Sequence, residues 1–84
     1  MWYIILKKDE KISNGYSILI SKNKRILEEN NIIQKYEFDE NDELQKIRKF
    51  IFENFELYNT FYLFSDTIGD IHYIHFIKDD LKVL

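Results

Sequence analysis

The chain has 84 residues, of which 45% are hydrophobic and 17% aromatic, with a formal net charge of −3 and neither cysteine nor proline. One small domain spanning residues 1–84 is therefore expected, while disulfides, cysteine metal sites and thiol chemistry are excluded. The weak negative charge provides no overall attraction for nucleic acid, and no apolar run approaches the roughly 20 residues of a membrane span.

The N-terminal quarter begins with a clear strand signal. Residues 2–7 form a nearly continuous aromatic and β-branched run, typical of a strand buried on both faces. Turn-forming residues follow between Asp9 and Gly15. A strand and then a turn are therefore predicted before residue 16.

The segment from Tyr16 to Asn30 fits two periodicities. As a strand, it places Tyr16, Ile18 and Ile20 on one face. As a helix, it places most of its apolar residues in one stripe but leaves Ile18 outside. The stripe comprises Tyr16, Leu19, Ile20, Asn23, Ile26 and Leu27. The helix accounts for more residues and is the preferred interpretation.

The remaining elements alternate more regularly. Residues 32–38 predict a strand, and residues 43–56 predict a helix that Asp42 caps together with Gln45. Residues 60–64 and 71–77 predict two strands joined by a loop at 65–70, and a short final helix follows Asp79 or Asp80. The predicted fold is α/β, with the order β-α-β-α-β-β-α and a single sheet.

This order and three short segments resemble the glutaredoxins and the wider thioredoxin-like fold. The segments are Asn23-Lys24-Arg25-Ile26-Leu27, Glu43-Leu44-Gln45-Lys46-Ile47 and Asp79-Asp80-Leu81. The likeness spans nearly the whole chain and implies a small thioredoxin-like domain of the phage or viral type. The abundance of residues with AT-rich codons and the absence of alanine indicate an AT-rich genome, such as that of a phage, another virus or an AT-rich bacterium.

The catalytic parts of that family are missing. The two cysteine positions fall near Ser17 and Ile20, and neither side chain can act as a thiolate. No proline occupies the cis-proline position near Phe61, and no glycine pair occurs near Phe76 and Ile77. The resemblance therefore implies a relative without redox activity, glutathione binding or cofactor.

A second fold remains open. If residues 16–22 form a strand, residues 2–22 become an N-terminal hairpin turning through Ser13, Asn14 and Gly15. The domain is then α+β with an antiparallel sheet, and the glutaredoxin resemblance no longer applies.

No catalytic or metal site can be assembled from the sequence. His72 and His75 point to opposite faces of a strand, so they cannot share one metal ion. Ser65 and Asp66 occur without a motif for nucleophilic catalysis. We therefore expect no enzyme activity, no metal and no cofactor.

The leading functional hypothesis is a non-catalytic protein-interaction module located in the cytoplasm, or in the host cytoplasm for a viral protein. Its candidate interface follows the rim that a thioredoxin-like fold uses: Asn14, Gly15, Tyr16, Ser17, Tyr58, Phe61 and Lys78. A self-associating form of the module would pair two copies through an edge strand at Gln34 to Phe38, or through the outer face of the helix at 43–56.

The alternative hypothesis is a small phage or viral inhibitor that binds a host defence or replication protein. Its acidic surface would mimic nucleic acid and comprises Glu37, Asp39, Glu40 and Asp42, with Glu43 adjacent. A solvated turn at a helix N-terminus explains the same residues without any partner.

Overall fold

The computed structural model describes residues 1–59 and 62–78. Its first two strands, β1 (Trp2–Lys8) and β2 (Gly15–Ser21), form an antiparallel hairpin with Leu6 opposite Ile18. A backbone hydrogen bond of 2.8 Å from Asp9 N to the Gly15 oxygen closes the turn. Asn14 takes a positive φ of 57°, a conformation that asparagine tolerates better than most residues. The N-terminal hairpin is thereby confirmed.

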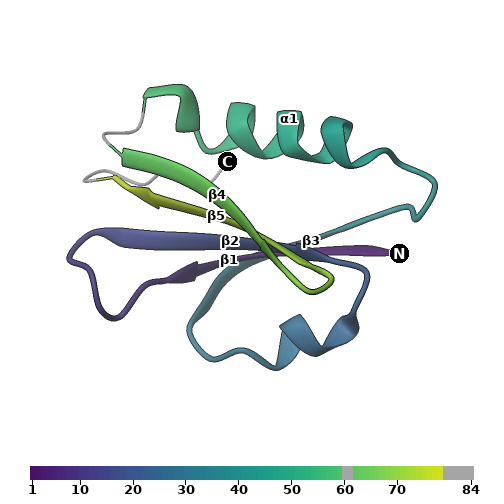
Figure 1. The fold of residues 1–84 in the computed structure, drawn as a ribbon, viewed down its shortest axis with the longest axis horizontal. Helices are drawn as coiled ribbons and strands as arrows, with labels where there is room; N and C mark the ends of the chain where they lie inside the picture. The colour runs from purple at the N-terminus through teal and green to yellow at the C-terminus, as the bar shows by residue number, and fades with distance from the viewer. Residues whose placement is uncertain (60–61, 79–84) are drawn as a thin grey trace.

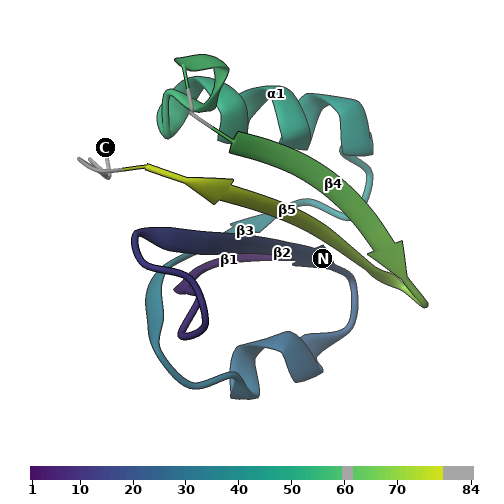
Figure 2. The same cartoon turned by 60° about the vertical axis from the view of Figure 1, so that its left-hand side comes forward.

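Five strands form one open antiparallel sheet in the order β3-β1-β2-β5-β4. The other three strands are β3 (Ile32–Phe38), β4 (Tyr62–Ile68) and β5 (Ile71–Ile77). Figure 1 shows the helix α1 (Leu44–Asn54) above the sheet and the short 3₁₀ helix η1 (Lys24–Glu28) below it. The turned view in Figure 2 shows the same three layers.

This topology corrects the preferred sequence interpretation. Residues 16–21 belong to a strand that pairs antiparallel with both β1 and β5, so no parallel β-α-β unit forms there. Ser17 and Ile20 consequently lie within the central strand β2, whereas the reactive thiol of a glutaredoxin lies at the N-terminus of a helix. The domain is α+β, and its topology does not support the thioredoxin-like order.

Both faces of the sheet bury apolar side chains. The face toward α1 holds the larger cluster: Ile4, Leu6, Ile18, Ile20, Ile47, Ile51, Phe55, Leu57, Ile74 and Phe76. The face toward η1 holds a smaller cluster of Ile5, Leu19 and Ile26. Since β2 is covered on both sides, its centre, Ile18 to Ile20, is a continuous apolar run instead of an alternating one.

The helix α1 confirms the predicted apolar stripe, since Ile47 and Ile51 are fully buried. Its start differs from the prediction: Glu43 is the N-cap residue and makes no side-chain cap hydrogen bond. Asp42 instead forms an ion pair of 3.0 Å with Lys46. A second 3₁₀ helix, η2 (Leu57–Asn59), follows α1.

The C-terminal hairpin is formed by β4 and β5, with Ile68 opposite Ile71. Strand β4 extends to Ile68, through residues predicted as a loop, and the turn is reduced to Gly69 and Asp70. Gly69 has a φ of 62°, which suits a two-residue hairpin turn. Phe61 and the predicted final helix at 79–84 lie outside the described residues. In the part of the chain that is described, no helix has the length and apolarity to cross a membrane.

Candidate functional site

The residues of the predicted rim fall into separate environments. Asn14 and Lys78 meet at one end of the sheet, where Lys78 N donates a 3.0 Å hydrogen bond to the Asn14 oxygen. Tyr58 is 69% exposed and contacts Phe52 of α1, at 5.3 Å between ring centroids. Gly15 and Ser17 are buried. Within the described residues, the set therefore does not form one accessible surface.

Lys78 has a structural position in this arrangement. Its ammonium donates to the Phe55 and Glu56 carbonyl oxygens at 2.9 and 3.4 Å, just beyond the end of α1. Only 15% of its side chain is exposed. A cation at the C-terminal end of a helix satisfies free carbonyl groups and complements the helix dipole. Lys78, which directly follows β5, thus connects the end of this strand to the C-terminal end of α1.

The predicted acidic residues mostly have local partners. Asp39 Oδ1 accepts from the Asn41 backbone N–H at 2.8 Å, and Glu40 lies 3.5 Å from the N-terminal ammonium. Asp42 pairs with Lys46 on the first turn of α1. Only Glu37 lies on a strand, on the exposed side of β3. The acidic run is therefore chiefly a turn that connects β3 to α1.

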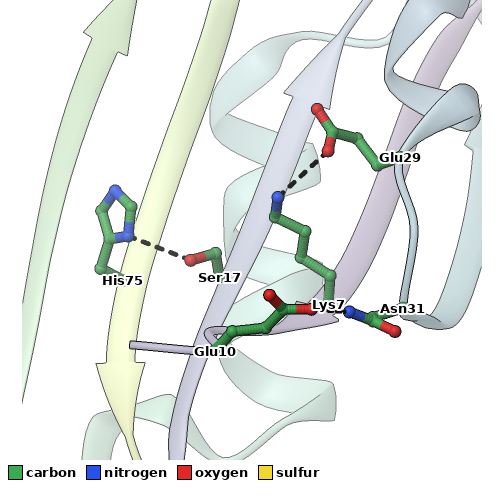
Figure 3. Close-up of polar contacts among 6 residues, drawn as sticks. All are labelled: Lys7, Glu10, Ser17, Glu29, Asn31 and His75. Carbon is green, nitrogen blue, oxygen red and sulfur yellow. Dashed lines mark hydrogen bonds and ion pairs between the residues drawn. The ribbon is translucent and has the colours of Figure 1, made fainter. Parts of the chain in front are cut away.

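A polar hollow of about 460 Å³ lies on the η1 side of the sheet. Its wall includes three lysines and three carboxylates, so the charges balance: Lys7, Lys8, Lys11, Asp9, Glu10 and Glu29. Lys7 is paired with Glu29 at 3.2 Å, and the Asn31 amide donates to Glu10 (Figure 3). Most of this polar surface is therefore already engaged within the chain.

The floor of the hollow contains a serine–histidine contact. Ser17 Oγ and His75 Nδ1 are hydrogen-bonded at 3.1 Å, and the two residues are direct partners on β2 and β5 (Figure 3). Ser17 is only 4% exposed. A nucleophile must reach its substrate, whereas a buried hydroxyl must find a hydrogen-bond partner inside the fold. The second requirement explains this contact.

The two histidines occupy opposite faces of β5, as predicted. His75 meets Ser17 on the η1 side, while His72 lies 6.3 Å from Trp2 between ring centroids. Among residues 1–59 and 62–78, no group of three or more histidine, aspartate or glutamate side chains is placed to hold a metal ion.

Strand β3 forms one of the two edges of the sheet in the described structure, and β4 forms the other. Strand β3 is the outer neighbour of β1, and in the described structure β1 is its single partner strand. Its seven residues alternate between half-buried and exposed, with Ile33, Lys35 and Glu37 exposed. A register irregularity lies at its start, opposite Leu6 and Lys7, so residues 34–38 form the regular part. The outward N–H and C=O groups of this part offer a template for another strand.

Aromatic side chains flank this edge on the α1 side. Phe50 of α1 contacts Tyr36 and Phe38 of β3, with ring centroids 5.5 and 5.0 Å apart. All three rings are half-buried. Strand pairing at this edge would cover more of their surface, which adds an apolar contribution to the main-chain hydrogen bonds.

Comparison with protein-family models, curated proteins and solved structures gave no match.

Proposed function

We propose that this protein is a non-catalytic interaction module that binds by adding a strand to the edge of its sheet at β3. The observation that carries the proposal is an edge strand whose regular part, residues 34–38, has β1 as its one partner strand in the described structure and is flanked by half-buried aromatic rings. Strand addition uses such an edge directly, because main-chain hydrogen bonds extend the existing ladder.

The other candidate surfaces are less available to a partner, because many of their charged side chains already have partners within the chain. Lys78 is engaged at the end of α1, and in the hollow beside Ser17 the Lys7 side chain pairs with Glu29 and the Glu10 side chain with Asn31. Asp39, Glu40 and Asp42 stabilise a local turn. The geometry thus favours the edge over an acidic, nucleic-acid-like surface.

The partner at this edge is a second copy of the chain. Lys35 and Glu37 are exposed on the same side of β3, two positions apart, and neither makes an ion pair within the described residues. A strand that carries both charges on one side is complementary to an antiparallel copy of itself. A two-fold symmetric interface of this kind is the commonest form of self-association.

The association should be reversible and dependent on concentration. The edge strand supplies 7 residues, whereas a stable interface uses roughly 20–30 residues on each side. Sedimentation velocity is therefore expected to show a monomer at micromolar concentration and a growing dimer fraction toward millimolar concentration. A strict monomer throughout that range would overturn the proposal.

A further inference from the structure

We infer that the two copies pair antiparallel in a single register, with Tyr36 opposite Tyr36 and two reciprocal ion pairs between Lys35 and Glu37. The inference rests on the proposed function and specifies how the second copy sits on the edge. It joins the two sheets into one continuous sheet through β3, and both α1 helices lie on the same side of it.

The alternation of β3 limits the registers to be considered. Directly opposite residues in a continuous antiparallel sheet share one face. Gln34, Tyr36 and Phe38 face α1, because their partners on β1 face it; Lys35 and Glu37 face the other way. With Tyr36 at the centre, each Lys35 lies opposite the second copy's Glu37, and each Gln34 lies opposite the second copy's Phe38.

The neighbouring registers with the same faces are electrostatically poorer. Centring the pair on residue 35 places two lysines opposite each other, and centring it on residue 37 places two glutamates opposite each other. Like charges directly opposite destabilise a strand pair, whereas opposite charges stabilise it. The register centred on Tyr36 is the one that makes two attractive pairs and no repulsive one between these residues.

The aromatic side of the edge agrees with this register. It places the two Tyr36 rings at the symmetry axis, beside the Phe50 ring of each copy. Aromatic cross-strand pairs are among the more favourable ones, and the flanking rings lose further exposed area on pairing. The two faces of the strand therefore favour the same alignment.

The test uses charge reversal, with sedimentation as the measurement. Lys35→Glu creates two Glu–Glu contacts and Glu37→Lys creates two Lys–Lys contacts, so each variant alone should weaken dimerisation by about tenfold. The double variant Lys35→Glu/Glu37→Lys restores both attractive pairs and should dimerise like the wild type. An equimolar mixture of the two single variants should form a heterodimer, because both of its contacts are attractive.

The matched controls are Lys24→Glu and Glu28→Lys, which alter the net charge by the same amounts at exposed positions of η1. They should dimerise like the wild type, and circular dichroism should show all variants folded. A wild-type dimer unaffected by the single changes at 35 and 37 would overturn the register while leaving edge pairing intact. A wild-type monomer would overturn both.

Discussion

Replacing Ile18 with alanine should lower the free energy of unfolding by about 2–5 kcal/mol, as for other fully buried isoleucines. Ile18 is 0% exposed and lies at the centre of the sheet, opposite Leu6 on β1 and Ile74 on β5. The truncation leaves a cavity beneath α1 that rigid neighbouring strands cannot readily fill. Urea denaturation followed by circular dichroism measures the effect.

The matched control for Ile18→Ala is Ile68→Ala, because Ile68 is also in a strand but is 62% exposed. It should change the free energy of unfolding by less than about 0.5 kcal/mol. The result also separates the two folds considered for the sequence, since Ile18 lies outside the apolar stripe of a helix at 16–30. Equal, small effects at both positions would contradict a central strand at 15–21.

Replacing Phe55 with alanine should have the largest effect, about 3–5 kcal/mol. The side chain is 0% exposed, packs between α1 and the sheet, and contacts Tyr36 with 6.1 Å between ring centroids. A domain of this size has a total stability of roughly 4–13 kcal/mol. Phe55→Ala is therefore expected to be partly or wholly unfolded at 37 °C, as measured by thermal denaturation.

Phe52→Ala provides the comparison on the same helix. Phe52 is half-buried, packs at the margin of the main core cluster and contacts Tyr58, with ring centroids 5.3 Å apart. Its truncation should lower the free energy of unfolding by about 1 kcal/mol. If Phe52→Ala were as destabilising as Phe55→Ala, the assignment of the core to one face of α1 would be incorrect.

The sequence predicted the strand at 32–38 and the stripe of α1, because these elements are covered on one side and retain a clear periodicity. The strand at 71–77 was also predicted, although its side chains pack on both faces of the sheet. The segment at 16–30 was misleading for a physical reason. Ile18, Leu19 and Ile20 are all buried because β2 is covered by α1 on one side and η1 on the other. A continuous apolar run fits helix and strand equally well.

Local polar contacts mark the end of β2, which the helical interpretation of residues 16–30 did not include. Ser21 Oγ accepts from the Asn23 backbone N–H at 2.9 Å, and Asn23 Oδ1 accepts from the Arg25 backbone N–H at 3.0 Å. Serine and asparagine two residues apart are typical of such turns. These residues are therefore a turn signal. They end the strand at residue 21, and the helical part of the segment is the short 3₁₀ helix η1.

The candidate interfaces were predictable to different degrees. The edge strand at Gln34 to Phe38 followed from a local pattern, and the structure places it at the sheet's edge. The rim depended on a long-range topology that the described residues do not show, and its described members lie in separate environments. The hollow lined by Lys7, Glu29 and His75 has no local sequence signal, because four separate stretches of the chain build it: residues 7–11, 17, 29–31 and 73–75.

Amide hydrogen exchange of the wild-type protein at two concentrations tests edge pairing most directly. Alternate N–H groups of residues 34–38 point away from β1 and should exchange rapidly when the protein is monomeric. At millimolar concentration we expect exchange of these outward N–H groups to slow, while the inward groups of β3 stay protected at both concentrations. Equal exchange of the outward groups at both concentrations would contradict pairing through β3.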